Sequence, residues 1–140
     1  MPASTDVDDI RHVLQDLGTW AVVGCSASPM RDSFGVARFL QAKGKRVVPV
    51  NPAQQEILGE TVYPDLAAAV AAGIDVEVVD VFRRADVAGR HVDEAIEIGA
   101  KAVWLQLGVI DEAAAERARA AGLVVVMDRC PKIEYPRLGR

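Results

Sequence analysis

The sequence predicts an α/β fold: a five-stranded, doubly wound parallel sheet with helices on both faces. Short apolar segments alternate with amphipathic ones along the chain, as strands and helices do in parallel sheets. Hydrophobic residues make up 51% of the 140 residues, and aromatic residues only 5%. An aliphatic core of this kind suits a sheet buried on both faces, and a chain of this length fills one core, so we expect residues 1–140 to form one domain.

The first expected element is a leading helix within residues 1–18. Thr5 and Asp8 have the spacing of a capping box, and Gly18 provides a stop. One face of this helix carries the apolar side chains of Val7, Ile10, Val13, Leu14 and Leu17.

The rest of the chain alternates between strands and helices. Right-handed crossovers between parallel strands predict the strand order 3-2-1-4-5. Residues 131–140 are expected to form an irregular C-terminal tail that Ile133 and Leu138 anchor. The expected strands are residues 20–23, 46–50, 76–81, 102–105 and 124–127, and the expected helices are residues 34–43, 64–72, 86–98 and one that Asp111 caps and Gly122 ends.

A sheet of this type binds ligands outside the carboxyl ends of its strands, near the point where the strand order reverses. The loops that follow the five strands should therefore meet at one crevice. These loops are residues 24–33, 51–52, 82–84, 106–109 and 128–131.

The loop after the first strand indicates an anion site. Backbone N–H groups in a small-residue loop and in the following helical turn have no intrahelical acceptor, and the helix dipole adds positive potential. The loop departs from the dinucleotide fingerprint G-x-G-x-x-G, because Ser26 takes the place of the second glycine and the helix begins later. The alternative is a tight connection without a ligand. Ser26, Ser28 and Ser33 supply hydroxyl donors, and Arg31 can approach a phosphate from outside. The candidate binding residues of this loop are Gly24, Cys25, Ser26, Ser28, Arg31, Ser33 and Phe34.

The end of the second strand argues against NAD. NAD-binding proteins usually place an acidic residue there to hold the ribose 2′-OH, whereas this chain has Asn51 and Pro52. A site without that carboxylate suits a ligand with an additional ribose phosphate.

Three further loops supply candidate binding residues. Val81 and Phe82 could line an adenine or pantetheine slot, and Arg83, like Arg84, is either a phosphate contact or a solvated residue at a helix start. Gln106 and Gly108 follow the fourth strand, in which Trp104 is expected to lie in the core. Asp80 and Asp128 lie near the crevice and are expected to anchor loops.

The two cysteines have different expected roles. Cys25 is expected to be a small buried side chain. Cys130 is expected to be structural, and the alternative is a redox or ligand-facing thiol that its basic neighbours Arg129 and Lys132 would make reactive. Since the two lie far apart without metal-ligand spacing, we expect neither a disulfide nor a metal site, and a reducing compartment.

Composition and motifs exclude several functions. A net charge of −4 offers no basic field for nucleic acid. No segment approaches the ~20 apolar residues of a membrane span, and residues 1–6 do not show a basic region followed by an apolar stretch, so a cytoplasmic location is expected. His12 and His91 lie within predicted helices and away from strand ends. With no nucleophile elbow or triad visible, no catalytic residue is predicted.

Five sequence blocks, taken together, resemble the small stand-alone CoA-binding-domain family, from about Val13 to the C-terminus. The family is similar to the N-terminal CoA-binding domain of the succinyl-CoA synthetase α subunit. The resemblance implies a Rossmann-type fold that holds coenzyme A across the strand ends. The blocks are VGCSASPMR (23–31), VPVNP (48–52), VDVFR (79–83), WLQLG (104–108) and DRCP (128–131).

The resemblance also implies roles for the candidate residues. Residues 24–28, with Arg31 and Ser33, would face the diphosphate, and residues 51–52 would border the adenosine. Residues 81–83 would flank the nucleotide or the pantetheine arm, while Gln106, Gly108 and Cys130 would shape the far wall. The chain departs from its relatives at Ala53, where they often carry Lys or Arg suited to the 3′-phosphate. It also has no counterpart of the synthetase's second domain, so ligase chemistry is not implied.

Three functions are consistent with the sequence. The first is non-catalytic binding of CoA or a short acyl-CoA, with oligomeric state and protein partners left open. The second is an NAD(P)-dependent oxidoreductase or an NAD-sensing domain, because one fold hosts several functions. The third is a thiol-based regulator in which Cys130 forms a mixed disulfide with CoA.

Overall fold

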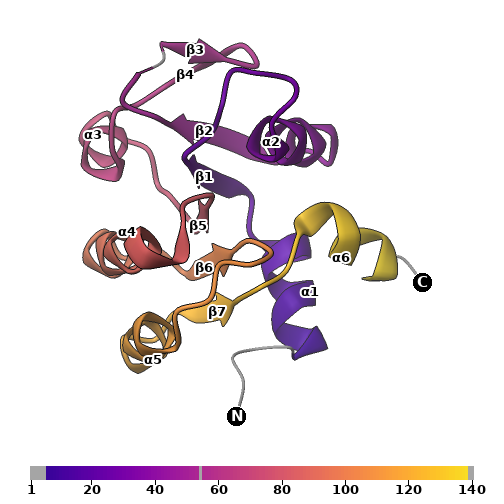
Figure 1. The fold of residues 1–140 in the computed structure, drawn as a ribbon, viewed down its shortest axis with the longest axis vertical. Coiled ribbons are helices and arrows are strands. Elements are labelled where there is room, and N and C mark those ends of the chain that lie inside the picture. The colour runs from indigo at the N-terminus through magenta and orange to yellow at the C-terminus, as the bar shows by residue number, and fades with distance from the viewer. Residues whose placement is uncertain (1–5, 54, 139–140) are drawn as a thin grey trace.

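The computed structural model describes residues 6–53 and 55–138, with strands and helices alternating along most of that length (Figure 1). None of the helices in these two ranges is long and apolar enough to cross a bilayer. The elements are α1 (Val7–Asp16), β1 (Thr19–Val23), α2 (Asp32–Ala42), β2 (Arg46–Val50), β3 (Glu56–Ile57), β4 (Glu60–Thr61), α3 (Leu66–Ala71), β5 (Val78–Val81), α4 (Ala85–Glu97), β6 (Ala102–Leu105), α5 (Glu112–Ala120), β7 (Val124–Val126) and α6 (Pro131–Leu138).

The main sheet has five parallel strands in the order β2-β1-β5-β6-β7, which confirms the predicted fold class. The predicted order 3-2-1-4-5 is wrong, because β5, the third strand of this sheet along the chain, pairs with β1 instead of lying outside β2. After β2 the chain forms the β3-β4 hairpin, and Tyr63 then makes an isolated parallel bridge with Val50. The chain then passes through α3 and returns on the other side of β1. The strand order therefore reverses between β1 and β5.

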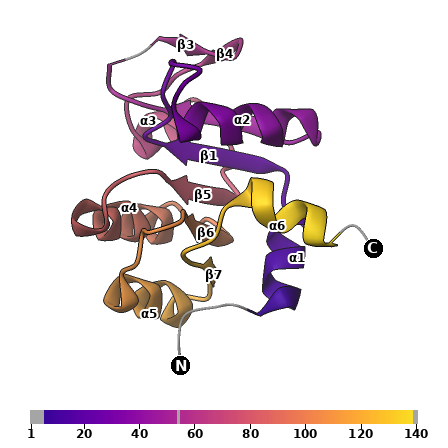
Figure 2. The same ribbon diagram turned by 45° about the vertical axis from the view of Figure 1, so that its right-hand side comes forward.

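Two helical layers cover the sheet. Helices α3, α4 and α5 lie on one face, and α1, α2 and α6 lie on the other (Figure 2). Alternate residues of each strand enter the two resulting cores: Ala21 and Val23 face the first layer, whereas Trp20 and Val22 face the second. Trp104 also lies in the second core, fully buried and with its ring centroid 5.7 Å from that of Trp20. Its predicted core position is confirmed.

The leading helix is present as α1 and buries Ile10, Val13 and Leu14. Its N-cap is Asp6, whose side chain accepts a hydrogen bond from the Asp8 N–H. Thr5, the residue expected to begin the capping box, lies outside the described residues.

The expectation of an irregular C-terminal tail is wrong, because residues 131–138 form α6. The Cys130 carbonyl accepts hydrogen bonds from the N–H groups of Ile133 and Glu134, both at 3.0 Å, and so starts the helix. Leu138 is buried and anchors it, as predicted, whereas Ile133 is 43% exposed and does not. Pro136 inside the helix obscured the helical pattern in the sequence, since proline there removes a backbone donor.

Candidate functional site

Two adjoining clefts lie at the carboxyl ends of the strands, and Arg31, Asp32 and Phe82 line both. The β1 cleft, of about 380 Å³, is lined by Gly24, Ser26, Arg31, Asp32, Ser33, Asn51 and Phe82. The α2–α6 cleft, of about 550 Å³, is lined by Pro29, Met30, Arg31, Asp32, Gly35, Val36, Arg38, Phe82, Gln106, Leu107, Val109, Cys130, Lys132 and Ile133.

Gly24 holds the loop after β1 against the loop after β5. Its φ angle is +84°, and a Cβ at this position would lie 2.6 Å from the carbonyl oxygen of Phe82 and 3.0 Å from Cδ of Arg83. Its N–H donates to the Val50 carbonyl at 2.9 Å. Only glycine meets both requirements, because a side chain would be strained by the backbone angle and would clash with a neighbouring backbone. Gly24 therefore fixes the floor of the β1 cleft at the point where the strand order reverses.

The serines of the first loop stabilise its turns. The Ser26 N–H donates to Ser33 Oγ at 2.9 Å, and the Ser28 N–H donates to Ser26 Oγ at 3.0 Å. The Ser28 carbonyl accepts a hydrogen bond from the Arg31 N–H. Ser26 and Ser33 also line the β1 cleft, whereas Ser28 lines neither cleft. The loop is therefore held in shape by the same hydroxyl groups that the sequence indicated as ligand donors.

The first turn of α2 leaves backbone donors open toward the β1 cleft. Its N-cap residue is Arg31, which makes no side-chain hydrogen bond to the helix. The first N–H groups of an α-helix have no intrahelical acceptor, so those of Asp32, Ser33 and Phe34 have none in α2. The helix dipole gives this end a partial positive charge. The arrangement is suited to an anion, although the carboxylate of Asp32 stands at its edge.

Asn51 joins the loop after β1 to the loop after β2. Its Nδ2 donates to the Cys25 carbonyl at 2.8 Å, and its Oδ1 accepts from the Ala53 N–H at 2.8 Å. A side chain that both donates and accepts is needed here, and a carboxylate at neutral pH only accepts. This geometry gives a structural reason for the missing acid at the end of the second strand.

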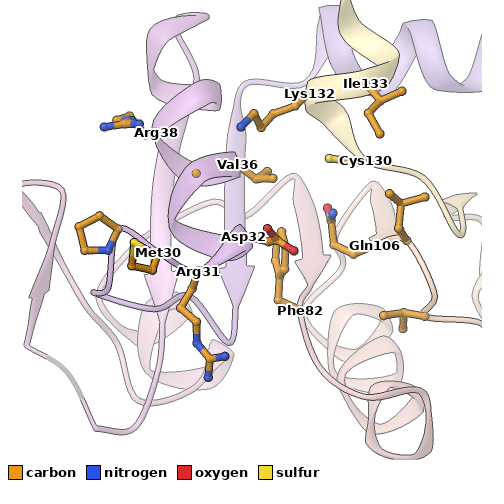
Figure 3. A pocket seen from close by; sticks show the side chains of 14 residues that line it. Met30, Arg31, Asp32, Val36, Arg38, Phe82, Gln106, Cys130, Lys132 and Ile133 are labelled. Atoms are coloured by element: carbon orange, nitrogen blue, oxygen red, sulfur yellow. The ribbon is translucent and has the colours of Figure 1, made fainter.

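The α2–α6 cleft runs between two helices that are far apart in the sequence. Gly35 and Arg38 lie four and seven residues beyond Arg31, on one face of α2, and Lys132 approaches that face from α6 (Figure 3). The Lys132 Nζ lies 3.6 Å from the position of a Cβ on Gly35, a distance of ordinary van der Waals contact, so the amine lies close to the α2 backbone. Three of the lining residues are cationic and one, Asp32, is acidic. The cleft is thus locally positive, although the chain carries a net charge of −4.

Gln106 and Cys130 form the far wall of the α2–α6 cleft. Gln106 is 6% exposed, and its Oε1 has no hydrogen-bond partner. Its side chain extends from the end of β6 toward Cys130 (Figure 3). Cys130 is half-buried and unpaired. Buried amide groups normally find partners in proteins, so an unpartnered one in the wall of a cleft is a candidate ligand contact.

Two buried titratable groups lie near the clefts. Burial raises the pKa of the Cys25 thiol to about 12, and nearby Asp80 adds to the shift. Asp80 lies in β5, is fully buried, and neither of its carboxylate oxygens has a partner. Burial raises the pKa of Asp80 well above its usual value. Cys25 is structural, as predicted, and the expectation that Asp80 anchors a loop is wrong.

The structure brings some of the predicted site residues together and separates others. The predicted site residues that line the two adjoining clefts are Gly24, Ser26, Arg31, Ser33, Asn51, Phe82, Gln106 and Cys130. Cys25, Ser28, Phe34, Val81 and Gly108 line neither cleft. Pro52 and Arg83 line a small recess with His91 and Glu94, on the other side of Gly24 from the β1 cleft.

Some of these residues support the site from outside. The Gly108 N–H donates to Asp128 Oδ1 at 2.8 Å, so Asp128 anchors a loop as predicted. Phe34 is partly buried, with the Arg38 guanidinium 5.8 Å from its ring centre. His12 and His91 lie outside both clefts, with Asp16 and Glu94 as their respective partners.

Sequence reasoning missed the part of the α2–α6 cleft that the two helices line. A helical reading of α2 places residues 31, 35 and 38 on one face and could have revealed Gly35 and Arg38. The packing of α6 beside α2 leaves no comparable pattern in the sequence. The cleft-lining residues that were not predicted as site residues are Pro29, Met30, Asp32, Gly35, Val36, Arg38, Leu107, Val109, Lys132 and Ile133.

Known proteins resemble the chain over nearly its whole length. It is 33% identical over 129 residues to the uncharacterized protein YneT of Bacillus subtilis strain 168, an alignment that covers 91% of this chain and 92% of that protein. A hypothetical protein from Pyrococcus horikoshii OT3 superposes with a TM-score of 0.89 at 36% identity, over 99% of this chain and 96% of that one.

A larger protein contains a similar unit. The dinucleotide-forming acetyl-coenzyme A synthetase 1 of Ca. Korarchaeum cryptofilum superposes with a TM-score of 0.71, over 84% of this chain and 28% of that one. At 22% identity this likeness shows the fold alone.

A family model described as a CoA binding domain matches residues 18–136. The match includes all five strands of the main sheet and every residue that lines the two clefts. The chain therefore belongs to the CoA binding domain family.

Proposed function

We propose that this chain binds coenzyme A or a short acyl-CoA without transforming it. In this proposal the diphosphate occupies the β1 cleft, the adenosine lies toward Asn51, and the pantetheine arm follows the α2–α6 cleft to Cys130. The observation that carries the proposal is the continuity of the two clefts: a cradle of backbone amides and hydroxyls opens into a longer groove of mixed polarity.

The width of the sheet fits this orientation. β1 and β7 are three strand spacings apart through β5 and β6, which corresponds to roughly 14 Å between their carboxyl ends. An extended pantetheine arm spans such a distance, so a CoA with its diphosphate at the end of β1 can bring its sulfur to the loop after β7. Cys130 of that loop lines the α2–α6 cleft and would stay out of reach of a ligand that ended at β5.

The charges of the clefts also fit CoA. Its three phosphate groups need cations, and Arg31, which lines both clefts, is our candidate for the 3′-phosphate in place of the basic residue missing at Ala53. Arg38 and Lys132 lie along the groove. The family match supports the proposal independently of these side chains.

Calorimetric titration with CoA, 3′-dephospho-CoA, NAD⁺ and NADH tests the proposal. We expect CoA to bind in the micromolar range and dephospho-CoA about tenfold more weakly, a difference of ~1.4 kcal/mol. Absence of CoA binding below the millimolar range would refute the proposal. Tight binding of NAD(H) without a response to CoA would favour the oxidoreductase or NAD-sensing alternative.

Native mass spectrometry of protein purified without added ligand identifies the acyl group. A retained CoA or acyl-CoA would appear as an added mass and would also show the oligomeric state. We propose the cytoplasm as the compartment, because CoA is available there and both cysteines are unpaired.

A further inference from the structure

We propose that Cys130 captures CoA covalently, by thiol–disulfide exchange with a CoA disulfide that the α2–α6 cleft has already bound. The product is a mixed disulfide between Cys130 and CoA. This inference rests on the proposed function, since the clefts must recognise the nucleotide before the sulfur atoms can meet.

The two cysteines differ in access to the clefts. Cys25 is fully buried and lines neither cleft, and its raised pKa makes it a poor nucleophile at neutral pH. Cys130 lines the α2–α6 cleft, and Figure 3 shows its sulfur directed into the space between α2 and α6. One thiol is therefore placed for reaction and the other is not.

The unpartnered amide of Gln106 indicates independently that a ligand passes this point. Gln106 is 6% exposed, and its Oε1 has no partner although its side chain lies in the wall of the cleft. The pantetheine arm contains two amide groups, which match a primary amide as donor and as acceptor. A hydrogen bond from the arm to Gln106 would hold the sulfur end of CoA next to Cys130.

Lys132 supplies a positive charge near the CoA thiolate that leaves in the exchange. It lies two residues after Cys130 in the same cleft, and within the described part of the chain no ion pair connects its amine to a carboxylate. Thiol–disulfide exchange releases a thiolate, which a nearby ammonium group stabilises. The cleft thus offers the nucleophile, a contact for the arm and a cation for the departing sulfur.

The reaction balances without a further oxidant. The Cys130 thiol loses its proton, and its sulfur attacks one sulfur of the CoA disulfide. The bond between the two CoA sulfurs breaks as the bond from Cys130 to CoA forms. The second CoA leaves as a thiolate and takes up the proton, so one disulfide is exchanged for another.

The test treats reduced protein, freed of reductant, with CoA disulfide or with glutathione disulfide. We expect one CoA adduct per chain by intact mass, mapped to Cys130 in the digested protein, and formed at least tenfold faster than the glutathione adduct. An excess of desulfo-CoA, which occupies the cleft but has no sulfur to exchange, should slow the reaction with CoA disulfide.

Reduced wild-type protein separates this inference from CoA binding. With a phosphine reductant present, the wild type should bind CoA without forming an adduct, and after the reductant is removed a Cys130→Ser variant should form no adduct with CoA disulfide. If the reduced wild type binds CoA but, freed of reductant, reacts no faster with CoA disulfide than with glutathione disulfide, or reacts at Cys25, the inference is wrong and the proposed function stands. If CoA does not bind and no preference is seen, both are wrong.

Discussion

The two ends of the sheet differ in how their polar groups are satisfied. At the amino end, the Glu77 carboxylate accepts hydrogen bonds from the N–H groups of Gly18, at 2.8 Å, and Thr19, at 3.0 Å. It also pairs with Lys101 at 3.4 Å. These contacts connect the starts of β1, β5 and β6. The Leu17 carbonyl there accepts from both the Trp20 indole and the Lys45 amine.

The carboxyl end leaves polar groups open. The Gln106 Oε1 has no partner, and neither α2 nor α4, the helices that follow β1 and β5, has a side-chain cap. The next helix, α5, is capped by Asp111, whose side chain accepts from the Ala114 N–H. Uncapped helices are therefore found on both sides of the point where the strand order reverses. Hydrogen bonding therefore stabilises the amino end, while the carboxyl end keeps open donors and acceptors that the proposed ligand would use.

The largest expected effect comes from Gly24→Ala. Its Cβ would clash with the Phe82 carbonyl at a positive φ, so we expect a loss of about 2–3 kcal/mol in the free energy of unfolding and more than 100-fold weaker CoA binding. Urea denaturation measures the free energy of unfolding, and calorimetry measures the affinity for CoA. Gly73→Ala is the matched control, because Gly73 has a φ of +89° with open space around it. Equal effects of the two substitutions would contradict the role assigned to Gly24.

The next largest effect tests the amino end. Removing the carboxylate in Glu77→Ala should cost about 2 kcal/mol of stability, because charge-assisted hydrogen bonds to two backbone groups are lost, and should leave CoA affinity unchanged. Glu97→Ala, at an exposed site, should change stability by less than ~0.5 kcal/mol. A large loss of CoA affinity in Glu77→Ala would show that the two ends are coupled.

The pH dependence of stability provides a second measurement on Glu77. Burial alone would raise its pKa, but the hydrogen bonds from Gly18 and Thr19 and the contact with Lys101 lower it below the usual 4.5. The contribution of Glu77 is therefore complete above pH 4.5 and is lost as the pH falls through the lower pKa of the folded state. The stability deficit of Glu77→Ala should shrink over that acidic range in urea titrations.

Arg31→Ala should weaken CoA binding about tenfold, or ~1.4 kcal/mol, because a cation next to both clefts is removed. If Arg31 binds the 3′-phosphate, the variant should bind CoA and dephospho-CoA with equal affinity in calorimetry. The control Arg90→Ala removes the same charge from an exposed position on α4 that lines neither cleft. A variant that still preferred CoA would assign the 3′-phosphate to another cation.

Gln106→Leu should have opposite effects on binding and stability. Losing the amide should weaken CoA about fivefold, or ~1 kcal/mol, whereas stability should stay equal or rise slightly, because a buried unpartnered group is removed. Thermal melts without ligand and calorimetry with CoA separate the two quantities. A clear loss of stability would indicate that the amide has a structural partner.

The smallest expected effect is a gain in stability from Asp80→Asn at neutral pH. Because burial raises the pKa of Asp80, the folded state binds more protons than the unfolded state, and wild-type stability falls as the pH rises above 3.8 toward the higher folded pKa. The difference between the variant and the wild type should therefore disappear below pH 3.8. The gain is small because the new amide is also buried without a partner. A variant less stable than wild type at pH 7 would contradict this expectation.

The strands and most helices could be predicted from the sequence because their signals are local. Residues 46–50 and 102–105 were predicted with the bounds that β2 and β6 have, and Asp111 caps α5 as expected. Strand order could not be predicted, because the side of β1 to which the chain returns depends on how the segment after β2 packs. The β3-β4 hairpin, with strands of two residues each, leaves no periodicity to detect.

The sequence by itself determined the fold class and the chemistry of the first loop. Glycine at position 24 followed by small hydroxyl residues before a helix specifies the loop locally, since backbone angles and first-turn donors depend on neighbouring residues. Only the tertiary structure decided that α6 lies beside α2. Leu138 enters the core, and Tyr135 packs edge-on against Phe39 with ring centroids 5.8 Å apart. That packing joins segments far apart in the chain, so no local pattern could reveal that Lys132 shares a cleft with Arg38.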